Sequence, residues 1–134
     1  MIRTVVDTNV SVSGLLFGGV PLKVIDAALA RRFTWVTSPI LMDEVDRVMR
    51  YKKFGLTEQE IAVLTQPLFS IAEIVVPVTT IEVIERCPAD NRVLECAVEG
   101  KCQIIVSGDR RDLLSLKRFQ NIEIFTPRQF LERM

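Results

Sequence analysis

Acidic side chains stand just beyond two short apolar runs of this chain. Asp7 follows the run 2–6, and Asp109 follows the run 104–106 after Ser107 and Gly108. In an open parallel sheet the carboxyl ends of the strands share one edge, and ligands bind along it. We therefore expect both carboxylates at that edge, although an aspartate in either position could also simply cap the helix that follows.

Glu44 lies on a predicted helix over residues 39–51, where Ser38 and Pro39 form a good helix start. Leu41, Val45 and Val48 form the apolar stripe of this helix, and Glu44 falls beside the stripe. Asp43 and Asp46 project toward the polar side. The helical spacing thus predicts that Glu44 turns toward the protein interior.

Asp90 repeats this arrangement on a predicted helix over residues 89–99, which Gly100 closes. Asp90 sits one turn before Val93 and Leu94, on the apolar face. On the opposite side of this helix we expect Arg92, Glu95 and Glu99. Alternatively, Asp90 is an acid near a helix N-terminus whose role is to complement the helix dipole.

Four carboxylates in one place repel one another, and burying them is costly unless a cation or hydrogen bonds stabilise them. A divalent cation removes the conflict. Oxygen ligands without histidine or cysteine favour Mg²⁺, Mn²⁺ or Ca²⁺ over zinc. The residues therefore predict a metal site formed by Asp7, Glu44, Asp90 and Asp109.

The residues that the chain lacks exclude other chemistry. There is no histidine, so Ser-His-Asp and Cys-His hydrolases are excluded. Cys87, Cys96 and Cys102 form no CxxC pair, which argues against a structural zinc site. An odd number of thiols and no recognisable signal peptide predict a cytoplasmic protein. No apolar run approaches the roughly 18 residues that span a membrane, so we expect no membrane association.

The overall charge is neutral, because Lys+Arg and Asp+Glu both total 17. Bulk charge therefore neither supports nor excludes a nucleic-acid substrate, for which the placement of the charges matters. Arg47 and Arg50 lie on the helix that carries Glu44, and Arg110 and Arg111 adjoin Asp109. These four arginines are candidates for binding phosphates, and the alternative is a solvated surface.

Strand and helix patterns alternate along the chain, which predicts an α/β sandwich with a mostly parallel central sheet. A helix that starts at Thr57 contains Pro67, which we expect to kink or divide it. No linker or repeat is evident, so we expect one domain over residues 1–134. The five predicted strands cover residues 2–6, 33–37, 74–78, 103–107 and 122–125, and the other helices cover 21–32 and a short stretch after Thr126.

Four blocks of the sequence resemble the motifs of PIN-domain nucleases, in the same order and with similar spacing over essentially the whole chain. The blocks are Val5-Val6-Asp7-Thr8-Asn9-Val10, the stretch 38–45 with Glu44, the stretch 88–97 with Asp90, and the stretch 105–109 followed by Asp112. The resemblance is strongest to the bacterial and archaeal toxin components of toxin–antitoxin systems.

This resemblance implies a three-layer fold with a five-stranded parallel sheet, and cleavage of single-stranded RNA that depends on Mg²⁺ or Mn²⁺. It makes Asp7, Glu44, Asp90 and Asp109 the acidic quartet, with Asn9 and Ser107 as polar supports. It also implies an antitoxin partner and a homodimer. Two departures from the family pattern concern Asp112, which follows two intervening arginines instead of one residue, and Cys87, which stands where relatives often carry an acid.

Two other functions compete with this hypothesis. A phosphoryl-transfer protein with an aspartate nucleophile would have a second acid beside or two residues after the first, whereas Thr8 and Asn9 follow Asp7. A non-catalytic binding module could use the same fold with its acids intact.

Overall fold

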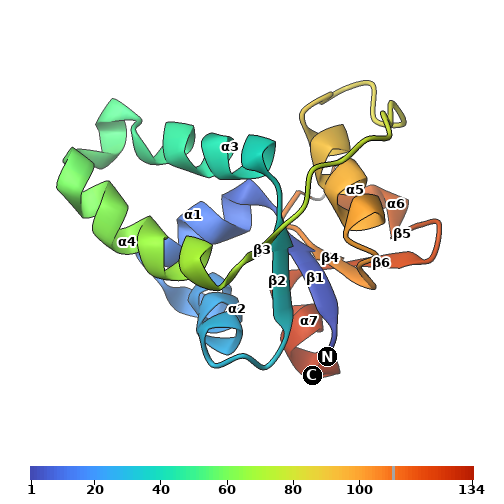
Figure 1. Ribbon diagram of the computed structural model, residues 1–134, viewed down its shortest axis with the longest axis horizontal. Coiled ribbons are helices and arrows are strands. Elements are labelled where there is room, and N and C mark those ends of the chain that lie inside the picture. The colour runs from blue at the N-terminus through green and yellow to red at the C-terminus, as the bar shows by residue number, and fades with distance from the viewer. Residues whose placement is uncertain (110) are drawn as a thin grey trace.

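The computed structural model describes residues 1–109 and 111–134, and its centre is a six-stranded sheet in the order β3-β2-β1-β4-β6-β5 (Figure 1). The strands are β1 (Arg3–Val6), β2 (Thr34–Thr37), β3 (Glu73–Ile74), β4 (Ile104–Val106), β5 (Arg118–Phe119) and β6 (Ile122–Phe125). All neighbouring pairs are parallel except β5 with β6. The predicted α/β fold with a mostly parallel sheet is thus confirmed, with one strand more than expected.

The differences in the strands have local causes. β5 is only two residues long and returns to β6 through Gln120, which has a positive φ of 54°. A strand so short carries no alternating pattern that a sequence could reveal. β3 spans two residues instead of the five predicted, and Pro77, which has no N–H to donate to a ladder, follows soon after.

Helices cover both faces of the sheet. On one face α1 (Thr8–Phe17), α2 (Gly19–Leu29) and α7 (Pro127–Arg133) surround a core that includes Phe33, Trp35 and Phe130. On the other face α5 (Asp90–Glu99) and α6 (Leu113–Leu116) pack over a core that includes Val36 and Ile105. Figure 1 shows these two layers on either side of the sheet, which confirms the three-layer arrangement.

Two helices form an arm beside the sheet (Figure 1). They are α3 (Pro39–Met49) and α4 (Glu58–Ile71), joined through a short 3₁₀ helix (Lys52–Phe54). A separate apolar cluster packs the arm against α1, with Val12, Val45, Met49 and Ile61 buried at its centre. α4 continues through Pro67 as one helix, so the proline does not divide it.

The segment 75–89, which we call the strap, runs from β3 across the outer side of α5 (Figure 1). Asn91 accepts hydrogen bonds from the backbone N–H groups of Val83 and Ile84, and Glu95 accepts one from Ile81 N at 2.9 Å. Glu95 is therefore only 8% exposed and Arg92 is half-buried. Helical spacing predicted only that Arg92, Glu95 and Glu99 lie opposite the apolar side of this helix; it does not show that a loop covers this polar face.

Gly100 ends α5 for a reason other than the one predicted. Its φ is −80°, and the left-handed residue is instead Lys101, with φ 52°. A Cβ on Gly100 would meet Val36 Cγ1 at 2.6 Å, so close packing against β2 requires the glycine.

Within the described residues, none of the helices alone has the length and hydropathy of a membrane span; α1 and α2 meet the criterion only jointly, across a 99° bend at Gly18.

Candidate active site

Asp7 lies where β1 ends and α1 begins, and its side chain is 5% exposed. Oδ1 accepts a hydrogen bond from Thr8 N at 2.8 Å, so Asp7 caps α1. Oδ2 accepts one from Ser107 Oγ at 2.9 Å. Asp7 therefore performs the capping role that the sequence allowed, while its second oxygen faces the end of the neighbouring strand.

Ser107 connects Asp7 to Asp109. The register that pairs Val6 with Val106 places Ser107, at the end of β4, beside Asp7. The fully buried Ser107 Oγ donates to Asp7 and accepts from Asp109 N at 2.9 Å. Asp109 Oδ1 in turn accepts from the backbone N–H groups of Arg111 and Asp112. The two strand-end acids thus share one edge of the sheet, as predicted, and a serine holds them there.

Glu44 reaches the same region from the arm. It is half-buried on α3, in the turn between the buried residues Leu41 and Val45, while Asp43 on the same helix is exposed. Its negative charge contributes to raising the pKa of Asp7, which places the two carboxylates within electrostatic range. Asp46 instead forms an ion pair with Arg50, whose guanidinium Nε lies 3.0 Å from Asp46 Oδ2.

Asp90 enters from the opposite face, at the first residue of α5. Its Oδ2 is shielded from solvent and has no hydrogen-bond partner among the described residues. The neighbouring carboxyl group of Asp109 and the charges of Asp7 and Asp112 act on the Asp90 side chain. Four segments that are distant in the sequence therefore form one acidic cluster, in which Glu44 and Asp109 act electrostatically on Asp7, and Asp7 and Asp109 act on Asp90.

Burial and mutual repulsion raise the pKa values of two carboxyl groups in this cluster. The pKa of Asp7 rises to about 6, mainly because the carboxylate is desolvated; the hydrogen bonds from Ser107 and Thr8 partly offset this rise, and the charges of Glu44 and Asp109 add smaller increases. The pKa of Asp90 rises to about 8, first through desolvation and then through Asp109 and the neighbouring charges. Both groups are therefore poorly stabilised as anions by the protein alone.

A divalent cation fits this set of residues. The buried Oδ2 of Asp90 has no partner, a raised pKa shows that the anion needs a positive charge, and within the described ranges none of the ion pairs involves the quartet. The donors are hard oxygens, which suit Mg²⁺ and Mn²⁺. Asp7, Glu44, Asp90 and Asp109 are the residues that could hold such an ion.

Asp112 and Cys87, the two departures from the family pattern, lie at the margin of the pocket. Asp112 precedes α6, and its carboxylate, the carboxylate of Asp90 and the Cys87 thiol have ligand atoms within 4.8 Å of one another. In the sequence, Cys87 stands out only as a thiol where relatives often carry an acid. The Cys87–Asp90 spacing was visible in the sequence, but nothing local indicated that Asp112 would join them.

The other predicted site residues have different surroundings. Asn9 is exposed on α1, and its side-chain amide lies near Gly108. A Cβ placed on Gly108 would be 3.8 Å from Asn9 Oδ1. Arg47 and Arg111 are exposed, and Arg47 Nη1 donates to the Tyr51 hydroxyl. Arg50 is engaged by Asp46 and Glu58. Arg110 lies outside the described residues.

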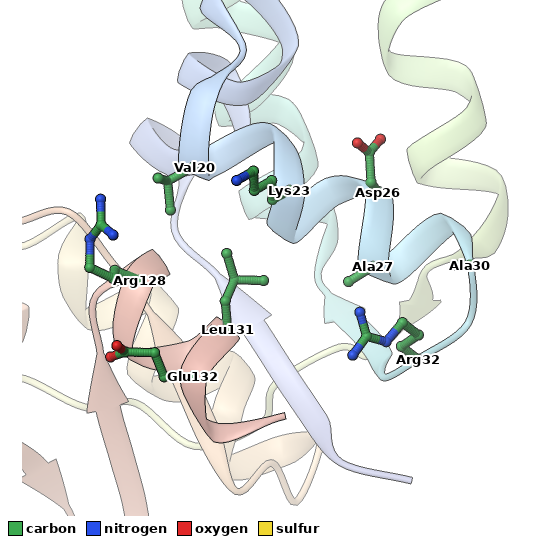
Figure 2. A pocket seen from close by; sticks show the side chains of 9 residues that line it. All are labelled: Val20, Lys23, Asp26, Ala27, Ala30, Arg32, Arg128, Leu131 and Glu132. Carbon is green, nitrogen blue, oxygen red and sulfur yellow. The ribbon is translucent and has the colours of Figure 1, made fainter.

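A cavity of about 620 Å³ lies elsewhere, between α2 and α7 (Figure 2). Basic and acidic side chains line it together, among them Lys23, Arg128 and Glu132. None of the described predicted site residues lines this cavity.

Comparison with known proteins agrees with this geometry. The family model of the PIN domain matches residues 3–111, so the chain belongs to the PIN-domain family, whose members are generally nucleases. No curated protein sequence matches the chain significantly.

Among solved structures, the chain is similar to one in the crystal structure of VapBC2 from Rickettsia felis bound to a DNA fragment from their promoter. The TM-score is 0.63 at 15% identity, and the match covers 92% of this chain and 97% of the other. At this identity the likeness shows a shared fold.

Proposed function

We propose that this PIN domain is an endoribonuclease that hydrolyses phosphodiester bonds in single-stranded RNA with Mg²⁺ or Mn²⁺. The observation that carries the proposal is the convergence of Asp7, Glu44, Asp90 and Asp109, with Asp90 Oδ2 buried and unpartnered. Membership in a family of nucleases supports a nucleic-acid substrate for this pocket.

In this mechanism, side chains of the protein bind the metal ion and orient its ligands. The four carboxylates would hold the ion, and Asp112, which lies beside Asp90, would be available as a fifth. Ser107 fixes the orientation of Asp7 Oδ2. When bound, a divalent ion supplies Lewis-acid stabilisation of the charge that develops on the phosphate. Without a cation the acidic cluster repels RNA, so substrate binding and catalysis both depend on the binding of the metal ion.

Flanking phosphates would contact the exposed guanidinium groups of Arg111, beside Asp109, and Arg47, on the helix of Glu44. Arg50 contributes less, because two carboxylates already occupy it. Arg110 stays a prediction from the sequence.

The test is cleavage of a labelled mixed single-stranded RNA pool by the purified protein with Mg²⁺, Mn²⁺ or EDTA. We expect cleavage with the metals, none with EDTA, and a loss of at least about 100-fold in Asp7→Asn and Glu44→Gln. Asp43→Asn is the matched control, because Asp43 adjoins Glu44 but is exposed. Equal cleavage by wild type and Asp7→Asn would identify a contaminating nuclease and refute the proposal.

We further propose that the protein acts in the cytoplasm as the toxin of a toxin–antitoxin pair and forms a homodimer. The structural neighbour, which is a VapBC2 complex, supports a small antitoxin partner. Co-expression with the product of an adjacent small open reading frame should yield a stable complex and restore the growth that the protein alone inhibits. Light scattering of the purified chain should give twice the 15.2 kDa monomer mass.

Two other functions predict different results. A non-catalytic binding module would bind RNA without cleaving it under any metal condition. An aspartate-based phosphoryl-transfer protein would form a covalent aspartyl adduct with a phosphate mimic, which mass spectrometry would detect on Asp7.

A further inference from the structure

The thiol of Cys87 lies against two carboxylates that belong to different parts of the fold. Cys87 lies near the C-terminal end of the strap, and its carbonyl accepts a hydrogen bond from Asp90 N at 3.0 Å, which fixes a tight turn into α5. Asp112 comes from a different part of the fold, immediately before α6. One sulfur and two carboxylate oxygens from these residues lie within 4.8 Å of one another, and all three residues are half-buried.

Among the residues that the structure describes, no basic side chain balances the charge of this cluster. Asp90 Oδ2 is shielded from solvent and accepts no hydrogen bond from the described residues. Within residues 1–109 and 111–134, neither Asp90 nor Asp112 forms an ion pair with a basic side chain. Two neighbouring carboxylates without a counter-charge are stabilised when a cation binds between them.

The ligand types differ from those of the quartet. Magnesium takes hard oxygen ligands and has little affinity for sulfur, whereas zinc and cobalt bind thiolate and carboxylate together. Three protein ligands leave a fourth tetrahedral position open, as in zinc sites that hold water or substrate. A cysteine at this point therefore changes which ion the pocket prefers.

We infer that Cys87, Asp90 and Asp112 form a thiolate-containing subsite beside the acidic quartet that binds a thiophilic divalent ion of the Zn²⁺ class. The inference deepens the proposed function, because Asp90 belongs to both sets of ligands. On binding, the metal–sulfur bond forms and the thiol proton passes to solvent. An ion in this subsite competes with Mg²⁺ or Mn²⁺ for Asp90.

The test is a Co²⁺ titration of the reduced, metal-free protein, followed by absorption spectroscopy. Wild type should show a thiolate-to-cobalt charge-transfer band in the near ultraviolet that saturates at one equivalent and that Zn²⁺ abolishes. Cys87→Ser should lose this band, and Asp112→Asn should weaken the binding by about tenfold or more. Cys102→Ala, which removes a thiol buried elsewhere in the core, should keep the band.

A second variant shows whether loss of the band reflects the missing thiol or a misfolded protein. Cys87→Asp converts the cluster to oxygen ligands, so it should lose the charge-transfer band yet bind Mn²⁺, measured by electron paramagnetic resonance, at least as tightly as wild type. A band that persists in Cys87→Ser, or no band in a wild-type protein that binds Co²⁺, would overturn the inference.

The outcomes separate this inference from the proposed function. Cleavage of RNA with Mn²⁺ but no thiolate band would overturn only the subsite. A thiolate band that requires Cys87, in a protein that cleaves no RNA under any condition, would support the subsite and overturn the nuclease.

Discussion

The Ser107 hydroxyl donates a 2.9 Å hydrogen bond to Asp7 Oδ2 across 100 residues of chain. Ser107 Oγ also accepts a hydrogen bond from Asp109 N, so one buried side chain sets the distance between two acids of the cluster. Because β1 and β4 are adjacent and parallel, this link is a direct consequence of the sheet register.

Removing that hydroxyl should affect stability and metal binding together. Ser107→Ala leaves the Asp109 N–H without its partner and removes one of the bonds that lower the Asp7 pKa. We expect a loss of about 1–3 kcal/mol in the free energy of unfolding, measured in urea, and Mn²⁺ affinity about 10- to 100-fold weaker. Ser70→Ala, which removes an exposed hydroxyl bonded to a backbone carbonyl, should change neither quantity. Unchanged Mn²⁺ affinity in Ser107→Ala would show that the serine does not orient the site.

The acidic pocket should make the metal-free protein less stable as the pH rises. The folded Asp90 retains a proton up to about pH 8, whereas in the unfolded chain its carboxyl group loses the proton near the ordinary aspartate pKa of 3.8. Between these values the folded state binds more protons, so the free energy of unfolding falls with rising pH. Asp7 acts in the same direction up to about pH 6.

Thermal melts in EDTA should therefore give a higher Tm at about pH 5 than at about pH 8.5. Asp90→Asn should reduce this difference, and the exposed Asp43→Asn should leave it as in wild type. A Tm that rises across this interval in wild type, or an unaltered slope in Asp90→Asn, would contradict the raised pKa of Asp90.

Divalent ions should stabilise the folded protein. An ion that binds only the folded state adds about 2.7 kcal/mol at 100 times its Kd, because its binding shifts the folding equilibrium. We expect Mn²⁺ to raise Tm in wild type and Asp43→Asn, and EDTA to reverse the effect. Asp7→Asn should show little of this increase; an equal increase in that variant would place the bound ion outside the quartet.

The strap should depend on Asn91, which is 2% exposed and makes three hydrogen bonds to the backbone of Val83 and Ile84. Asn91→Ala leaves two N–H groups and a carbonyl unpaired, so we expect a loss of about 2–3 kcal/mol in the free energy of unfolding. Limited proteolysis should then cleave within residues 75–89. Asn121→Ala, at an exposed turn, is the matched control. Full protection of the strap in Asn91→Ala would mean that its apolar contacts alone hold it in place.

Local patterns in the sequence were sufficient for much of this architecture. Short apolar runs followed by acids predicted that Asp7 and Asp109 share one edge of a parallel sheet, and helical spacing predicted that Glu44 turns inward while Asp43 stays in solvent. The capping box at Thr57 and Glu60 is present as predicted. These features depend on the period of a helix or strand, which the order of residues specifies directly.

Only the tertiary structure decided which polar faces are covered and which distant side chains meet. The outer face of α5 has an ordinary solvated pattern, yet the strap buries Asn91 and Glu95 against it. Cys87 and Asp112 come together because α5 and α6 pack on the same face of the sheet. Gly100 is needed because the side chain of Val36, on β2, lies within 2.6 Å of where a Cβ would be. Periodicity tells which way a side chain points, but the neighbour that it meets is set by chain folded back from elsewhere.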